Sequence, residues 1–486
     1  MRSAYAEVLR IAVPLMISTG MFSLVLFADR TLLFQHEPAE MGAAMAAGNL
    51  FWVSICIFVG IASMTGAIAS QYVGAGRPNR IGRMLWQSVW FSLATMPLFL
   101  TLAYFAEPLF KWTDQAPTLI PLQTVYFQIL MWGGAGEVLQ TALSGFFSGT
   151  HRTRTIAIVS VVSGVLNLLL DYLLIFGIDP GWWGGDGDVV LELGIAGAGI
   201  ASVISFWFKA VCYAAILLKP QFRNSYGIIR GLCFDRRMMW RLAYFGFPAG
   251  LMYVTEAGAF SVIVLMIGRL GDVPLQATTM AINFNMIAFI PLVGMSIAAS
   301  VLVGQHLVRS GHEPAIRCVR AALTIAWAYS AAWALAYWFG AETLISLYAL
   351  NQSESTIPGD AALALKTAEG LLGFVAIYVL LDATQLILAG ALRGAGDTWF
   401  VLIAGLSVSV VALTIGIVFE PTWEPALWGT DDLATPTTAT TPTTMSDSVS
   451  GTLRWWWMIL TGWVISLAAA MSARYLQGSW KRMRMV

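Results

Sequence analysis

An acidic side chain stands in the middle of an apolar segment near residue 380. The segment YVLLDATQLILAGALRG covers residues 378–394, and it places Asp382 among leucines and alanines. A carboxylate at the centre of a bilayer costs about 2.5–3.5 kcal/mol on insertion scales. We therefore expect Asp382 either to be neutralised by a neighbour or to take up and release a cation or a proton.

Further acids fall inside similar apolar segments: Asp29, Glu137, Asp171, Glu256 and Glu369. Each could be a structural hydrogen-bonding group, but few bases lie within such segments, and Lys209 and Arg30 are the clearest. Ion pairing is therefore insufficient as a general explanation of these acids. Removal from water favours the neutral form of a carboxyl group, so these groups can hold a proton or a metal cation.

Asp171 has a polar neighbour on its own helix face. In VLNLLLDYLL, Asn167 precedes Asp171 by four residues, a spacing that places both side chains on one side of a helix. An amide oxygen beside a carboxylate offers hard oxygen ligands for a small cation. The spacing is equally compatible with an Asn–Asp hydrogen bond within the helix.

The composition indicates a polytopic α-helical membrane protein. Of the 486 residues, 58% are hydrophobic and 11% are charged, whereas soluble domains carry about 25% charged residues. Apolar runs long enough to span a bilayer recur along the chain, and they lack the short alternating pattern of membrane β-barrels. We predict twelve spanning helices, at about 8–34, 41–73, 84–106, 118–149, 153–177, 194–218, 239–269, 273–307, 315–340, 361–393, 398–419 and 454–477.

Charge distribution predicts the orientation of these helices. With the first helix starting inside the cell, the inner connections and both termini hold 21 of the 27 Lys and Arg residues. Outer connections hold acids instead, among them Asp179, Asp186, Glu420 and Asp431. This bias is the one that orients membrane proteins, so both termini are expected in the cytoplasm. The Thr- and Pro-rich outer loop 420–453 is expected to be disordered.

The chain contains a weak internal repeat. A shift of 234 residues pairs Pro14 with Pro248, and it also pairs Asn49 with Asn283, Gln71 with Gln305 and Arg83 with Arg317. A shift of 245 residues pairs Glu137 with Asp382 and Gln140 with Gln385. Six helices per copy give two lobes related by a pseudo-two-fold axis along the membrane normal, as in several transporter folds. The expected divisions are a lobe over 1–218, a cytoplasmic linker over 219–238 and a lobe over 239–486.

Other functional classes receive little support. The net charge is zero, so no nucleic-acid partner is expected. Cys56, Cys212, Cys233 and Cys318 form no CxxC pair, so neither a disulfide framework nor a zinc motif is indicated. GAGD, ending at Asp397, matches the GxGD of intramembrane aspartyl proteases, but a catalytic dyad needs carboxylates about 3 Å apart. Asp397 is predicted in a cytoplasmic turn, far from Asp382, and we expect no enzyme.

Several segments resemble the multidrug and toxic compound extrusion (MATE) family. The similar motifs are VPLMISTGMFSLVLFADRTLL, GIASMTGAIASQYVGAGRPNRIGR, NLLLDYLLIFG, FPAGLMYVTEAGAF, GMSIAASVLVGQ and LLDATQLILAGALRGAGDT. The resemblance implies antiport of organic cations against Na⁺ or H⁺ in the inner membrane. It implies that Asp29, Asn167, Asp171, Glu256 and Asp382 couple ion and substrate, with Glu137 and Ser202 as additional candidates.

The resemblance also implies a possible Na⁺ site at Asp29, Asn167 and Asp171. Arg30, which directly follows Asp29, departs from the family pattern, in which Thr is more usual there. We expect no cofactor beyond the coupling ion, and we expect a monomer. The alternative function is a flippase of lipid-linked oligosaccharides or lipid precursors, which would need basic residues facing its central cavity.

Overall fold

The computed structural model describes residues 2–112, 118–177, 192–346, 359–421 and 447–486. These residues are predominantly helical, and no strand occurs among them. Asp179, Asp186, Asp431 and most of the loop 420–453 lie outside the described residues. The expectations for those positions therefore stay predictions.

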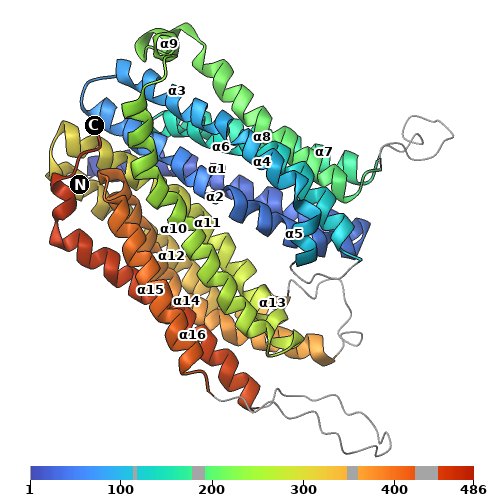
Figure 1. The fold of residues 1–486 in the computed structure, drawn as a ribbon. Helices are drawn as coiled ribbons and strands as arrows, with labels where there is room; N and C mark the ends of the chain where they lie inside the picture. The colour runs from blue at the N-terminus through green and yellow to red at the C-terminus, as the bar shows by residue number, and fades with distance from the viewer. Residues whose placement is uncertain (1, 113–117, 178–191, 347–358, 422–446) are drawn as a thin grey trace, which may run out of the picture.

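The first half of the chain forms one bundle of helices, here called the first lobe (Figure 1). Its helices are α1 (Arg2–His36), α2 (Pro38–Gly74), α3 (Asn79–Ala94), α4 (Met96–Tyr104), α5 (Ala106–Trp112), α6 (Ile120–Gly149), α7 (Thr153–Ile175) and α8 (Ile195–Leu217). Two short helices follow in the linker, α9 (Pro220–Ser225) and the 3-10 helix η2 (Ile229–Gly231).

The second half forms the second lobe. Its helices are α10 (Arg236–Gly268), α11 (Asp272–Arg309), α12 (His312–Phe339), α13 (Ala341–Ser346), α14 (Gly359–Ala395), α15 (Thr398–Val418), α16 (Asp447–Gln477) and the 3-10 helix η4 (Ser479–Arg482). Eleven helical stretches within the described residues are long and apolar enough to cross a membrane, with α3 and α4 counted as one stretch. The 30-residue α6 completes the predicted set of twelve.

The predicted third span is not one continuous helix. It is divided between α3 and α4 at Thr95. Pro97 has no backbone N–H to donate, and the Thr95 hydroxyl donates to the Ser92 carbonyl at 2.6 Å. The predicted span over 84–106 is present as one stretch over Asn79–Tyr104, interrupted by a turn at Thr95.

Packing between helices repeats in the two lobes. α2 packs on α6 as α11 packs on α14, and α1 packs on α7 as α10 packs on α15. Between the lobes, α1 lies against α11 and α10 lies against α2, while α2 and α11 also meet each other. These equivalent pairings place the pseudo-two-fold axis between α2 and α11, as the repeated sequence predicts.

The lobes touch at the end of the molecule that holds both chain termini and diverge toward the other end (Figure 1). One buried apolar cluster contains residues of both lobes, including Leu15 and Ile61 of the first and Ala249 and Met295 of the second. The two remaining clusters belong to one lobe each. Burial of apolar surface therefore joins the lobes at one end only.

Glycines allow the backbones to approach closely where the lobes meet. A side chain added at Gly60 of α2 would collide with the Gly250 backbone of α10, and one added at Gly250 would collide with Ile57. Small residues permit such contact between membrane helices. Gly294 of α11 meets the backbone of Leu15 of α1 in the same way, so both equivalent crossings depend on glycine.

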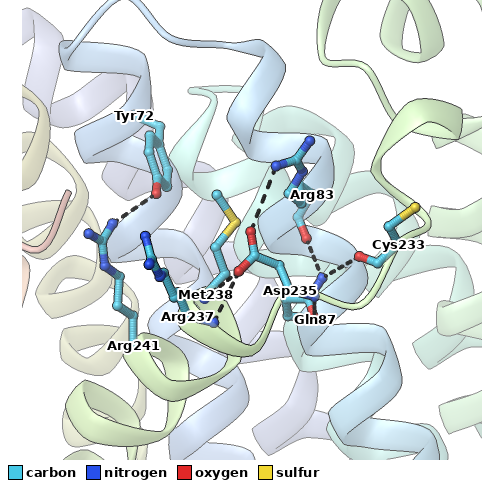
Figure 2. A network of polar contacts seen from close by, with 8 residues as sticks. All are labelled: Tyr72, Arg83, Gln87, Cys233, Asp235, Arg237, Met238 and Arg241. Atoms are coloured by element: carbon cyan, nitrogen blue, oxygen red, sulfur yellow. Dashed lines mark hydrogen bonds and ion pairs between the residues drawn. The ribbon is translucent and has the colours of Figure 1, made fainter.

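The linker is fastened to the first lobe. Asp235 caps α10 by accepting from the backbone N–H groups of Arg237 and Met238 at 3.0 and 3.2 Å, and it forms an ion pair with Arg83 of α3 at 3.7 Å (Figure 2). The Gln87 side chain donates to the Cys233 carbonyl at 3.1 Å and accepts from the Asp235 N–H at 3.0 Å. The start of α10 is therefore held by side chains of α3.

We predict that Gly250→Ala lowers the thermal unfolding midpoint of the protein in detergent. The added methyl group must displace the Ile57 backbone, and overpacking of this kind costs about 1–3 kcal/mol. Gly258→Ala is the matched control, because nothing lies within 4 Å of a side chain added at that point of the same helix. Equal midpoints for the two variants would contradict the assigned helix crossing.

Candidate functional site

A group of polar side chains lies inside the first lobe, where α1, α6 and α7 come together. Asp29 of α1 and Asn167 and Asp171 of α7 are each at most 5% exposed. Tyr126 of α6 donates its hydroxyl hydrogen to Asp29 Oδ2 at 3.4 Å. The charges of Asp29 and Asp171 interact with each other, and both act on Tyr126. These four residues are called the first-lobe cluster.

Most polar atoms of the first-lobe cluster have no partner. Among the described residues, none forms a hydrogen bond to Asp29 Oδ1, to either carboxylate oxygen of Asp171 or to either amide atom of Asn167. The possible Asn167–Asp171 hydrogen bond within the helix is thus not made. Buried polar atoms without partners cost free energy, and folded proteins keep few of them. Their concentration here marks a place suited to a cation or a proton.

Arg30 does not neutralise the cluster directly. It is close enough to Asp29 and Tyr126 to interact with their charges, yet the described side chains show no ion pair between Arg30 and Asp29. Asp29 therefore remains an available carboxylate despite the unusual residue that follows it.

A second polar group lies between α10 and α14 and is called the second-lobe cluster. Gln385 of α14 donates to Glu256 Oε1 of α10 at 3.2 Å. Asp382, one turn earlier on α14, is 8% exposed and interacts electrostatically with Glu256. The sequence predicted Glu256 and Asp382 as separate candidates, and the packing of α10 against α14 brings them together with Gln385.

Arg393 reaches back toward this second cluster. It lies in the last turn of α14, and its guanidinium donates to Ser296 Oγ of α11 at 3.2 Å. Its charge also acts on Glu256. The sequence predicted Arg393 in an inner connection between helices. Its electrostatic interaction with Glu256 could therefore be recognised only in the folded chain.

Glu137, the repeat counterpart of Asp382, has a hydrogen-bond partner on one of its two carboxylate oxygens. Gln140 donates to Glu137 Oε1 at 2.8 Å on the same helix, and the charge of Lys209 on α8 acts on the carboxylate. Ser202 is half-buried on α8, one turn before the buried Ser205. Glu137 Oε2 is buried without a hydrogen-bond partner among the described residues, so this acid is only partly compensated.

Both clusters lie beyond the contact between the lobes, on the side away from the termini. Glu256 follows Gly250 by six residues, about 9 Å along α10. Asp29 follows Leu15 by fourteen residues, about 21 Å along α1. The acids are therefore positioned where the lobes have already begun to separate.

Asp397 belongs to neither cluster. It precedes α15, and Arg474 of α16 binds it with two nitrogens, Nε at 2.7 Å from Oδ2 and Nη2 at 3.3 Å from Oδ1. The same guanidinium lies 4.5 Å from the ring centre of Phe400. Both oxygens of Asp397 are thus engaged in a structural contact, which argues against the protease dyad with Asp382.

The MatE family model matches residues 14–173 and again residues 248–422. The chain belongs to the MATE family. The two matched segments coincide with the two lobes, in keeping with the repeat. Members of this family are transporters, so the chain is a multi-pass membrane transporter and not an enzyme.

Individual MATE proteins resemble the chain along most of its length. It is 28% identical over 389 residues to a probable multidrug resistance protein NorM of Xanthomonas campestris pv. campestris, covering 80% of this chain and 81% of the relative. It is 27% identical over 438 residues to the multidrug resistance protein PmpM of Pseudomonas aeruginosa, covering 88% of each chain.

A solved structure shares the fold. The crystal structure of the eukaryotic MATE transporter AtDTX14 superposes with a TM-score of 0.79 at 16% identity, covering 99% of this chain and 97% of the other. At this identity the likeness shows the fold alone. Tyr126 and its bond to Asp29 were missed by sequence reasoning, because a tyrosine in an apolar helix carries no signal of its own.

We predict that Asp171→Asn leaves the thermal unfolding midpoint unchanged or raises it. The substitution removes a buried charge that makes no hydrogen bond, at nearly constant volume. Asp397→Asn is the matched comparison, because it breaks a charged contact with Arg474 and should cost about 2 kcal/mol. A larger loss of stability for Asp171→Asn than for Asp397→Asn would contradict the contrast between the two carboxylates.

Proposed function

We propose that this protein is a secondary antiporter that exports organic cations in exchange for Na⁺ or H⁺. We further propose that it resides in the inner membrane with both termini in the cytoplasm, and that it works as a monomer. The names of its multidrug-resistance relatives support export of multiple compounds. The excess of Lys and Arg at one end of the helices supports the orientation.

The observation that carries the ion-coupled part of the proposal is the set of unpartnered oxygens in the first-lobe cluster. Asp29, Asn167 and Asp171 offer carboxylate and amide oxygens that no described residue satisfies. Such hard oxygen donors suit a small cation, and a proton on either carboxyl group would equally remove the cost of the buried charge. We propose that these residues hold the coupling ion.

The second-lobe cluster is proposed to act on the transported compound as well as on the ion. Asp382 and Glu256 place two carboxyl groups close enough for their charges to act on each other. Two like charges in a poorly solvated place favour uptake of a positive partner. Because the five central acids outnumber the nearby bases Arg30, Lys209 and Arg393, an organic cation fits this protein better than the phosphate of a lipid-linked sugar.

The arrangement of the lobes suits alternating access. They touch at the end that holds the termini and diverge toward the other end (Figure 1). With the termini in the cytoplasm, this arrangement is the outward-open state. The linker packs on the first lobe through its bonds to α3, so we propose that rocking of the second lobe is absorbed near the start of α10, between Asp235 and Gly250.

Coupling follows from competition for negative charge. In the outward state, external Na⁺ or H⁺ neutralises the buried acids and weakens their attraction for the organic cation, which leaves. In the inward state the ion is released, the carboxylates become charged again, and a new organic cation binds. Because such coupling is reciprocal, the compound and the ion must weaken each other's binding by the same factor.

We expect Asp382→Asn to abolish gradient-driven dye efflux from cells or vesicles. The amide keeps the size of the side chain but can neither carry the charge nor accept a proton. Glu107→Gln is the control, because Glu107 pairs with Lys111 on the exposed surface. Efflux that persists in Asp382→Asn at the level of the control would refute the coupling role of Asp382.

Binding of a planar cationic dye should weaken as Na⁺ or H⁺ rises. The expected change in dye affinity is about 5–150-fold, the usual range for a coupling of about 1–3 kcal/mol. The measurement is a titration of purified protein with dye at several pH and Na⁺ values. If affinity is indifferent to both ions, the antiport proposal fails and a flippase becomes the better account.

A further inference from the structure

Three side chains that commonly bind transition metals meet where the lobes touch. They are Glu7 of α1, His306 of α11 and Cys318 of α12, and one ligand atom of each lies within 4.8 Å of the others. His306 Nε2 is 3.1 Å from Glu7 Oε1, and Cys318 Sγ is 3.9 Å from Glu7 Oε2. Because α1 belongs to one lobe and α11 and α12 to the other, the group spans the interface.

The three residue types are ones that zinc takes as ligands in tetrahedral sites. Zinc binds imidazole nitrogen and carboxylate oxygen at about 2.0–2.2 Å and thiolate sulfur at about 2.3 Å. Tetrahedral geometry then separates neighbouring ligand atoms by about 3.3–3.8 Å. The three ligand atoms lie within 4.8 Å of one another, so small side-chain movements would bring them onto one ion. A carboxylate and a thiolate would together neutralise the two positive charges of the ion.

We propose that Glu7, His306 and Cys318 bind Zn²⁺ or a similar divalent transition metal at the interface of the lobes. The site is reachable, because the Glu7 side chain is 37% exposed. His151 lies next to it: its charge interacts with Glu7 and His306, and its Nε2 is buried without a hydrogen-bond partner among the described residues. His151 is not among the residues whose ligand atoms lie within 4.8 Å of one another, so the fourth ligand position is left open to solvent.

His151 occupies an unusual backbone conformation. Its φ angle of 61° is the one positive value among the non-glycine residues described, and such conformations persist only where surrounding structure maintains them. The residue follows α6, so this conformation sets the course of the first-lobe backbone beside Glu7 and His306.

The same residues can also form a simple hydrogen-bonded group without metal. Glu7 would then accept from His306 and from the Cys318 thiol, and the positive charge of Arg309, which acts on Glu7, would favour the carboxylate. The two interpretations differ in one measurable respect: only the metal site requires a thiolate bonded to a metal ion.

Cobalt(II) is the probe for the site. The full-length protein, purified in detergent, reduced and free of metal, is titrated with Co²⁺ while thiolate-to-cobalt absorption in the near ultraviolet is followed. We expect one Co²⁺ per chain, displaced by Zn²⁺. Cys318→Ser should abolish the band, and His306→Gln should weaken binding at least about tenfold. Cys233→Ser, which changes an exposed cysteine of the linker, should retain it.

The proposal is overturned if the wild-type protein shows no thiolate-to-cobalt band, or if the band survives Cys318→Ser. Both results are independent of transport, so they decide the site even if the antiport proposal fails. If the proposed function holds, a metal that links the lobes stabilises the outward-open state. Zn²⁺ should then slow dye efflux by the wild type and by Cys233→Ser, but not by Cys318→Ser.

Discussion

The constraint on which this structure depends is the cost of placing charge in a medium without water. Helices satisfy every backbone group within the bilayer, so the fold itself makes no demand on charged side chains. Each carboxyl group inside the bundle must therefore either be paired with a neighbouring side chain or remain unpaired, at a cost in free energy, as a group that can bind a cation or a proton. Asp397 shows the first solution, because Arg474 binds both of its oxygens. Glu137 shows it in part, because Gln140 donates to one oxygen while the other is unpartnered among the described residues. Asp171 shows the second, with both oxygens unpartnered.

The position of the acids relative to the glycine crossings connects this constraint to movement. Close backbone contact joins the lobes at Gly250 of α10 and at Leu15 of α1, and Glu256 and Asp29 lie further along these two helices. If one lobe tilted relative to the other about these crossings, the surroundings of the acids would change. The packing of helices within each lobe would change less. Uptake of a positive ion and a change of lobe orientation can therefore influence each other without any direct contact between the two clusters.

Pseudo-symmetry of the helices does not extend to their chemistry. Glu137 and Asp382 occupy equivalent positions of α6 and α14, yet Gln140 bonds within its own helix whereas Gln385 bonds across to Glu256 of α10. The first-lobe cluster has no counterpart at the repeat-equivalent positions of α10 and α15. A duplicated scaffold thus carries two different polar sites, one in each lobe.

Much of the architecture could be predicted from the sequence, because membrane helices are recognised by the length and apolar composition of their segments. The sequence alone predicted the twelve helices, the repeat and the candidate acids. The spacing of four residues between Asn167 and Asp171 predicted that their side chains share one helix face. Only the tertiary structure decided which acids have partners. Three of these contacts join residues far apart in the sequence. They are Tyr126 with Asp29, 97 positions apart, Gln385 with Glu256, 129 positions apart, and Arg474 with Asp397, 77 positions apart. Helical periodicity carries no information about such contacts, which depend on how whole helices pack.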